Sequence, residues 1–132
     1  MNIKTINFLT QLKNASMINK ESIRLESNRF ILRVLKVLYK EGFILSYRVQ
    51  EKKAFMNKTS EVIVNIRYVQ NKPVFNNLKI ISSPSFQKLV SLKNISRLVS
   101  KKKFFLFSTN LGLLTLNECK KMHVGGFLLF VC

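Results

Sequence analysis

Aspartate and tryptophan are absent from this chain of 132 residues, which also contains only one histidine and two cysteines. A structural zinc site normally takes four ligands, most often cysteine and histidine in closely spaced pairs. Cys119, Cys132 and His123 cannot supply such a set, and two cysteines are too few for a disulfide framework in a chain of this length. We therefore expect no metal site and two reduced thiols.

Catalytic groups are equally scarce. No aspartate exists to orient a histidine, and all six acidic residues are glutamates that stand apart in the sequence. The four glycines form no phosphate-binding loop of the P-loop or dinucleotide type, and Gly125-Gly126 is too short to count as one. The sequence thus predicts a protein that is not an enzyme and takes neither a cofactor nor a small-molecule substrate.

Long apolar runs are missing as well. No uninterrupted stretch approaches the roughly 18 residues that span a bilayer, so an integral membrane protein is not expected. Hydrophobic residues nevertheless make up 47% of the chain, which is enough apolar material to build a core. The length suits one domain or two small ones.

Because acidic residues are so few, the charge balance is strongly one-sided. Lysine and arginine number 23 against 6 glutamates, and the formal net charge is +17. Such a surface attracts polyanions, chiefly nucleic acid or anionic lipid, and charge alone does not choose between them. Lysines outnumber arginines 17 to 6, which favours point-charge contacts with phosphate over base reading by arginine.

The pattern of residues 1–72 predicts a two-layer α/β sandwich with the element order α-β-α-β-β. Ser27 is the expected N-cap of the second helix, and Gly42 is expected to end that helix in a left-handed conformation. The polar stretch 51–60 is expected to be a loop. The expected elements are a first helix that ends before Asn14, a second helix at 30–41, and strands at 22–26, 43–49 and 62–69.

Residues 73–132 are predicted to form a smaller, mainly β domain with a short helix, which makes the whole chain α+β. Thr115 and Glu118 have the spacing of a capping box that opens a helix over 116–122. The stretch 85–100 is ambiguous and suggests a short helix or an ordered loop. The expected strands are 74–82, 104–107 and 127–131, with a turn at 108–112 and a chain break at Gly125-Gly126.

Ser108-Thr109-Asn110 is the most informative polar cluster in the chain, because it follows directly on an apolar strand. Short hydroxyl and amide side chains at a strand-end turn can reach ribose 2′-hydroxyls and base edges in the shallow minor groove of RNA. Taken by itself, the motif is more often a plain turn.

From Leu9 onward, a series of short motifs resembles, in order and spacing, the bacterial-type small-subunit ribosomal protein eight family. Residues 9–15 (LTQLKNA) are similar to the family's Leu-Thr-x-Ile-Arg-Asn-Ala opening, and residues 40–44 (KEGFI) to its Glu-Glu-Gly-Phe-Ile helix end. Ser83-Pro84 stands where the family has Ser-Arg-Pro-Gly. Residues 108–112 (STNLG) are similar to its Ser-Thr-Ser-Lys-Gly loop, and residues 115–126 to its Met-Thr-…-Gly-Gly segment.

The chain departs from the family pattern at several of these positions. Lys101-Lys102-Lys103 stands in place of a Gly-x-Gly, Leu111 in place of a lysine, and Phe127 in place of a glutamate. Asn110 replaces a serine and Leu116 an aspartate. The groups offered at individual contact positions therefore differ from those of the family.

The resemblance implies a primary rRNA-binding protein that docks on the central domain of small-subunit rRNA and helps to fold it. It also implies neighbouring proteins such as small-subunit protein five, and no membrane partner. The RNA-binding residues that it implies are Thr10, Lys13, Asn14, Arg29, Pro84, Ser108, Thr109, Asn110, Gly112, Lys120, Gly125 and Gly126.

Two other functions stay open. The first is a free-standing translational regulator that binds a structured mRNA by mimicry of the rRNA site. The second is a basic peripheral membrane protein, because Arg29, Arg33, Lys36 and Lys40 form a stripe along the second expected helix.

The composition also bears on the origin of the gene. Lys, Asn, Phe, Ile and Tyr, which share A/T-rich codons, make up 55 of the 132 residues, a bias that is common in organelle genomes. The first 20 residues lack arginine and are poor in serine, unlike a transit peptide, and are interpreted as part of the fold. The expected location is the mitochondrial matrix, on the mitochondrial ribosome, with the gene inside the organelle; a plastid is the alternative.

Overall fold

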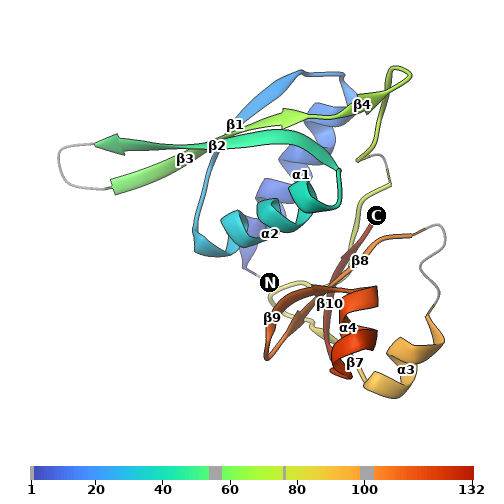
Figure 1. Ribbon diagram of the computed structural model, residues 1–132. Coiled ribbons are helices and arrows are strands. Elements are labelled where there is room, and N and C mark those ends of the chain that lie inside the picture. The colour runs from blue at the N-terminus through green and yellow to red at the C-terminus, as the bar shows by residue number, and fades with distance from the viewer. Residues whose placement is uncertain (1, 54–57, 76, 99–102) are drawn as a thin grey trace. The chain divides into compact units, whose positions relative to one another are not determined.

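The computed structural model describes residues 2–53, 58–75, 77–98 and 103–132 (Figure 1). The chain divides into two compact units. The N-terminal unit is Asn7–Asn76, and the C-terminal unit joins Met1–Ile6 to Asn77–Cys132. Together they confirm the expected α+β class.

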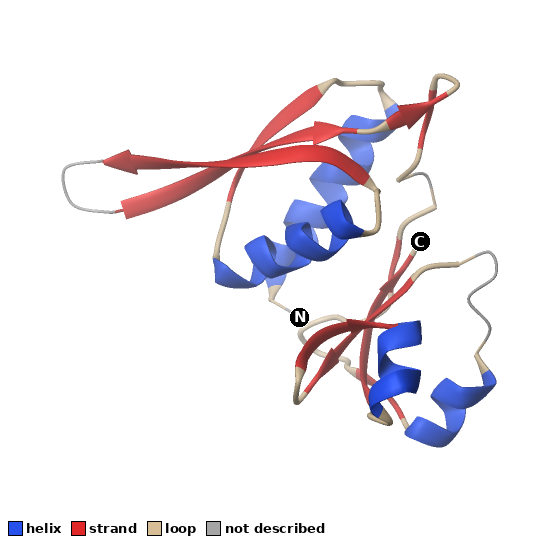
Figure 2. Ribbon diagram, viewed as in Figure 1, coloured by secondary structure: helices blue, strands red, loops and turns tan. Residues whose placement is uncertain are grey.

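The N-terminal unit is a two-layer sandwich with the expected order α-β-α-β-β, followed by a small hairpin. Its three-stranded sheet has the order β1-β3-β2, and both pairings are antiparallel. Figure 2 shows α1 and α2 on one side of this sheet. The elements are α1 (Ile3–Met17), which belongs to this unit from Asn7 onward, β1 (Ser22–Glu26), α2 (Arg29–Lys40), β2 (Ile44–Lys53), β3 (Lys58–Ile66), β4 (Tyr68–Val69) and β5 (Lys72–Pro73).

The core of this unit lies between the helices and the sheet. Every second residue of β3 from Val62 to Ile66 is buried, as the alternating pattern predicts for a strand with one covered face. On the helix side, α1 buries Leu9 and Leu12. The residues that α2 buries recur at helical spacing and are Ile31, Val34, Leu35 and Leu38.

The two ends of α2 test the capping expectations. The N-cap is Asn28, not Ser27, because the Asn28 side chain accepts a hydrogen bond from the Ile31 N–H at 2.8 Å. Ser27 instead donates its N–H to the Ser60 carbonyl at 2.9 Å, which extends the sheet by one pair. Gly42 has a φ of +81° just after the helix, as expected.

Two boundaries in this unit differ from the expectation. Residues 51–60 are not a loop, because β2 continues to Lys53 and β3 begins at Lys58, with Glu51 opposite Ser60; residues 54–57 lie outside the described ranges. The helix α1 continues past Asn14 to Met17 and is followed by Asn19 in a left-handed conformation. Both extensions contain polar residues, so the apolar pattern of the sequence does not extend over them. Backbone pairing and helix propagation nevertheless continue there, because neither requires apolar side chains.

The C-terminal unit is built around the strand β10. This strand pairs with β8 along one edge and with β6 and β7 along the other, while β9 pairs with β8; all pairings are antiparallel. The elements are β6 (Lys79–Ile80), β7 (Lys88–Val90), α3 (Leu92–Arg97), β8 (Phe105–Thr109), β9 (Gly112–Thr115), α4 (Leu116–Met122) and β10 (Gly126–Val131).

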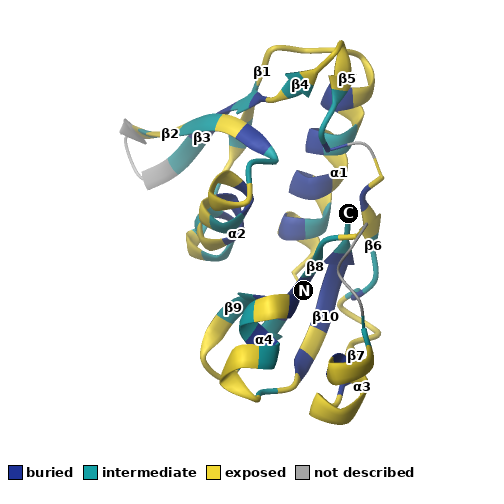
Figure 3. Cartoon of the chain, turned by 45° about the vertical axis from the view of Figure 1, so that its right-hand side comes forward, coloured by how far each residue is buried: buried dark blue, intermediate teal, exposed yellow. Residues whose placement is uncertain are grey.

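One face of this sheet carries a buried cluster together with the two helices (Figure 3). Its members come from α3, α4 and three strands: Val90, Ile95, Phe107, Leu116, Cys119 and Leu128. The capping box of α4 is confirmed, with the Thr115 N–H donating to the Glu118 carboxylate at 2.9 Å and the Glu118 N–H donating to the Thr115 hydroxyl at 3.4 Å.

Three expectations for this unit are corrected. The strand expected at 74–82 is reduced to Lys79–Ile80 in the described part of that stretch, because β10 pairs with only two residues there. The stretch 85–100 contains the short helix α3, one of the two structures expected there, so the described part of the unit contains two short helices, α3 and α4, in place of the single one expected. The turn expected at 108–112 is narrower, and a strand that the sequence did not predict, β9, begins at Gly112.

Among the helices of the described residues, none combines the length and the apolar character that a membrane crossing needs.

Candidate nucleic-acid interface

The Ser108–Gly112 motif forms a tight hairpin between β8 and β9. Thr109 pairs with Gly112, so the turn itself consists of Asn110 and Leu111. Gly112 has a φ of +110°, which L-residues with a side chain rarely adopt. Ser108 is therefore a strand residue, and only Asn110 of the three polar residues lies in the turn.

Thr109 holds this turn together. Its hydroxyl donates to the Gly112 carbonyl at 2.9 Å and accepts the Leu111 N–H at 3.2 Å. Among the described residues, neither the Ser108 hydroxyl nor the exposed Asn110 amide has a hydrogen-bond partner. The hairpin thus uses Thr109 as scaffold and leaves Ser108 and Asn110 able to bind a ligand.

The glycine pair packs against neighbouring strands. A Cβ atom at Gly126 would stand 2.5 Å from the Ser108 carbonyl oxygen, and one at Gly125 would stand 2.9 Å from the Val90 carbonyl oxygen. Both distances are shorter than real Cβ contacts allow. Gly126 is buried and Gly125 is exposed. The protein's own packing therefore requires both glycines.

Register places four residues in one row across the sheet. Leu89 of β7 lies opposite Phe127 of β10, Phe127 opposite Ser108 of β8, and Ser108 opposite Leu113 of β9. Directly opposed residues of a sheet point to the same face. Leu89 is 68% exposed and Phe127 is 38% exposed, so Ser108 is flanked by accessible apolar surface.

Sequence reasoning did not predict Leu89 or Phe127 as parts of this surface. In the structure Phe127 is exposed between the buried Gly126 and Leu128, but the sequence shows no alternation of polar and apolar residues at these positions. The five residues of β10 other than the glycine are all apolar or aromatic, a pattern that is also typical of a strand covered on both faces.

Pro84 lies in a separate turn of the same unit. The Ser83 and Phe86 backbones exchange hydrogen bonds, from Ser83 N–H to Phe86 O at 2.8 Å and from Phe86 N–H to Ser83 O at 3.2 Å. Pro84 and Ser85 occupy the exposed centre of this turn. The fixed φ of a proline ring suits Pro84 to the second position of a β-turn.

Lys120 on α4 has a structural partner. Its ammonium group donates to the Leu98 carbonyl just after α3. This contact joins the ends of the two short helices, and an RNA contact by Lys120 would have to share the same ammonium group. Lys121, the next residue, is exposed.

The remaining candidates belong to the N-terminal unit. Thr10, Lys13 and Asn14 lie on α1 at spacings of three and four residues, so they share one helix face. Arg29 is the exposed first residue of α2. It begins a row of exposed cations opposite the buried face of that helix: Arg29, Arg33, Lys36 and Lys40.

The candidate residues thus fall into two sets. The C-terminal unit brings Ser108, Thr109, Asn110, Gly112 and Gly126 together within one hairpin and its neighbouring strand. Pro84 and Lys120 lie on other elements of the same unit. Within the described ranges, no three histidine, cysteine or glutamate side chains gather in a way that could hold a metal ion.

Comparison with known proteins gives one consistent result. The family model of ribosomal protein S8 matches residues 4–132. The small ribosomal subunit protein uS8c of Oltmannsiellopsis viridis is 32% identical over 120 residues, covering 89% of this chain and 88% of that protein. The small ribosomal subunit protein uS8 of Brucella anthropi is 31% identical over 121 residues, covering 92% and 89%, and that of Wolbachia pipientis is 29% identical over 119 residues, covering 90% and 88%. With a match over nearly its whole length, the chain belongs to the ribosomal protein S8 family.

Proposed function

We propose that this chain is a structural constituent of the small ribosomal subunit that binds small-subunit rRNA directly and helps to fold its central domain. Family membership supports the subunit, and the net charge of +17 supports RNA as the ligand. The observation that carries the proposal is the β8–β9 hairpin, where Thr109 and Gly126 fix the positions of Ser108 and Asn110.

The mechanism is structural rather than catalytic. Exposed lysines and arginines neutralise converging phosphates and release counterions, which supplies affinity with little sequence preference. The Ser108 hydroxyl and the Asn110 amide supply hydrogen bonds to ribose and base edges, which a generic duplex does not present in the same geometry. Lys13 and Arg29 add phosphate contacts from the N-terminal unit.

Finer parts of the proposal rest on the sequence. The A/T-biased composition favours a mitochondrial ribosome, with a plastid as the alternative. We assign the main recognition surface to residues 73–132, and we expect small-subunit protein five among the neighbours. The scarcity of catalytic groups favours a protein without enzymatic activity.

RNA binding provides the direct test. The full chain should bind a central-domain fragment of small-subunit rRNA more tightly than a plain duplex of equal length. With about 5 phosphate contacts, the log–log dependence of affinity on salt should have a slope of roughly −3 to −5. Equal affinity for both RNAs, or a slope near zero, would contradict the proposal.

The native protein offers a second test. RNA recovered with it after sedimentation should be small-subunit rRNA. Recovery of a single mRNA with no rRNA would instead favour a translational regulator.

A further inference from the structure

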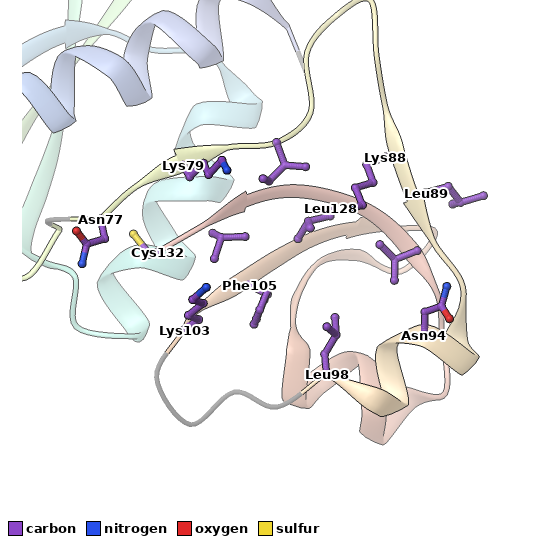
Figure 4. A pocket seen from close by; sticks show the side chains of 13 residues that line it. Asn77, Lys79, Lys88, Leu89, Asn94, Leu98, Lys103, Phe105, Leu128 and Cys132 are labelled. Carbon is purple, nitrogen blue, oxygen red and sulfur yellow. The ribbon is translucent and has the colours of Figure 1, made fainter.

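An open pocket of about 660 Å³ lies within the C-terminal unit, on the face of the sheet that carries α3 and α4 (Figure 4). It falls in the size range of ligand-binding clefts. It does not include Ser108, Asn110 or the glycine pair. Leu89 of β7 lines the pocket and also ends the row that contains Phe127 and Ser108, but the polar residues of the hairpin lie outside the pocket.

The floor of the pocket is an uncovered continuation of the core. Phe107 and Leu128 lie opposite each other and are buried, whereas the next row along the same face, Phe105 opposite Val131, is only partly buried. The Phe105 and Phe107 rings stack with centroids 6.5 Å apart, so the apolar strip continues from the covered row into the uncovered one. Ile81 and Leu98 add to this floor.

The rim of the pocket is basic. Register places Lys79 opposite Val131 and Lys88 opposite Leu128. Both lysine side chains therefore leave the backbone on the face of the sheet that carries the apolar floor. Lys103 contributes a third exposed cation, and Figure 4 shows the three lysines around Phe105 and Leu128. No aspartate or glutamate side chain is among the lining residues.

We propose that this pocket binds a protein segment that carries acidic and apolar residues close together. A ligand that fits an apolar floor next to three ammonium groups must offer apolar groups and negative charges close together. RNA phosphates would pair with the lysines but would leave the exposed parts of Phe105 and Val131 in water. A segment with glutamate or aspartate beside leucine, isoleucine or phenylalanine covers the floor and neutralises the rim.

The first experiment measures which chemistry the pocket selects. The probe is a short fluorescent peptide in which leucine and glutamate alternate, titrated against the full chain. It should bind at least about tenfold more tightly than a peptide with serine in place of leucine. Equal binding of the two peptides would show that charge alone acts, and would overturn the proposal. Backbone amide shifts at Ile81, Phe105 and Val131 should report the bound peptide on the unmodified protein, and shifts confined to other residues would equally overturn it.

The second experiment uses charge reversals matched in net charge. Lys79→Glu with Lys103→Glu changes two rim cations, whereas Lys93→Glu with Lys121→Glu changes two exposed cations of α3 and α4 outside the pocket. The rim pair should weaken binding of the leucine–glutamate peptide about tenfold, and the control pair less than about twofold. Equal losses in both variants would overturn the proposal. If the rim pair lowers the unfolding midpoint, Lys79→Ala with Lys103→Ala replaces it.

Binding to the central-domain RNA fragment separates this inference from the proposed function. Both charge-reversal pairs should weaken RNA binding equally, because each reverses two cations outside the β8–β9 hairpin. A selective loss with the rim pair would assign the pocket to RNA and overturn the inference, while leaving RNA binding itself established.

Discussion

Gly126 lies directly against Ser108, so that a Cβ atom at position 126 would stand 2.5 Å from the Ser108 carbonyl oxygen and 2.8 Å from Cγ2 of Thr109. The two motifs that the sequence offered as separate RNA-binding elements are therefore one packing unit. β10 approaches β8 closely only because residue 126 has no side chain. The position of the Ser108 hydroxyl thus depends on a glycine far along the chain.

Substitution of Gly126 by alanine should disturb both stability and RNA recognition. The added methyl group meets backbone rather than a flexible side chain, so β8 or β10 must shift, at a cost of about 2 kcal/mol in the free energy of unfolding. Gly125→Ala should cost less, because its nearest backbone atom is 2.9 Å away. Urea unfolding measures both. An equal or smaller loss for Gly126→Ala would show that β10 can move away freely.

The expectations that held are those decided by local chemistry. Gly42 and the Thr115–Glu118 capping box act within a few residues, and the alternation from Val62 to Ile66 reflects one buried face. The expectations that failed depended on which residues pair across the fold. Ser27 and Asn28 are both good caps, and the choice of Asn28 follows from the pairing of Ser27 with Ser60.

The candidate site shows the same division between local chemistry and distant partners. The residues of the hairpin could be identified from the Ser-Thr-Asn-x-Gly pattern, but the division of roles within it could not. Only the pairing of Thr109 with Gly112 shows that Thr109 closes the turn, whereas the Ser108 and Asn110 side chains take no part in closing it. The exposure of Phe127 depends on which face of the sheet the helices cover, and no local pattern records that.

Gly42→Val should destabilise the N-terminal unit. The φ of +81° is unfavourable for a β-branched residue, and a Cβ atom there would lie 2.9 Å from Nη1 of Arg67, which donates to the Gly42 carbonyl. We expect a loss of about 1–2 kcal/mol in the free energy of unfolding, measured by chemical denaturation. Leu45→Val, at an exposed position three residues later, should change the midpoint little. An unchanged midpoint for Gly42→Val would contradict the helix end described here.

The two thiols should react at very different rates. Cys119 is buried, and burial together with the neighbouring Glu118 carboxylate raises the pKa of its thiol, whereas Cys132 is partly exposed. Because the thiolate is the reactive form, an aromatic disulfide reagent should modify Cys132 in the folded protein and Cys119 only on unfolding. Rapid modification of both thiols under native conditions would contradict the burial of α4 against its sheet.

The raised pKa of Cys119 also predicts a pH dependence. A folded-state pKa above the ordinary value of 9.0 means that the unfolded chain loses this proton first as the pH rises. The contribution of the neutral thiol to stability is therefore complete below about pH 9 and is lost at higher pH. Denaturation midpoints measured across this range should fall less steeply for Cys119→Ala than for the parent.

The sharpest test of RNA recognition is replacement of Ser108 and Asn110 by alanine. If their polar groups contact ribose and base edges, each lost hydrogen bond should weaken binding to the central-domain fragment by about 1–3 kcal/mol. The loss should be nearly independent of salt, because neither side chain is charged. It should vanish on a generic RNA duplex, where only cationic contacts with phosphate operate.

Lys121→Ala provides the opposite pattern as a control. Replacement of this exposed lysine should cause a smaller loss of RNA affinity that is similar on both RNAs and shrinks at high salt.

Thr109→Ala distinguishes a residue that positions the turn from one that contacts RNA. The Thr109 hydroxyl closes the turn, so its removal should lower the stability of the protein as well as its affinity for RNA. If the Ser108 and Asn110 variant folds normally and binds the fragment as tightly as the parent, the hairpin is scaffold. Recognition must then come from Lys13, Asn14 and the surface beside the glycine pair.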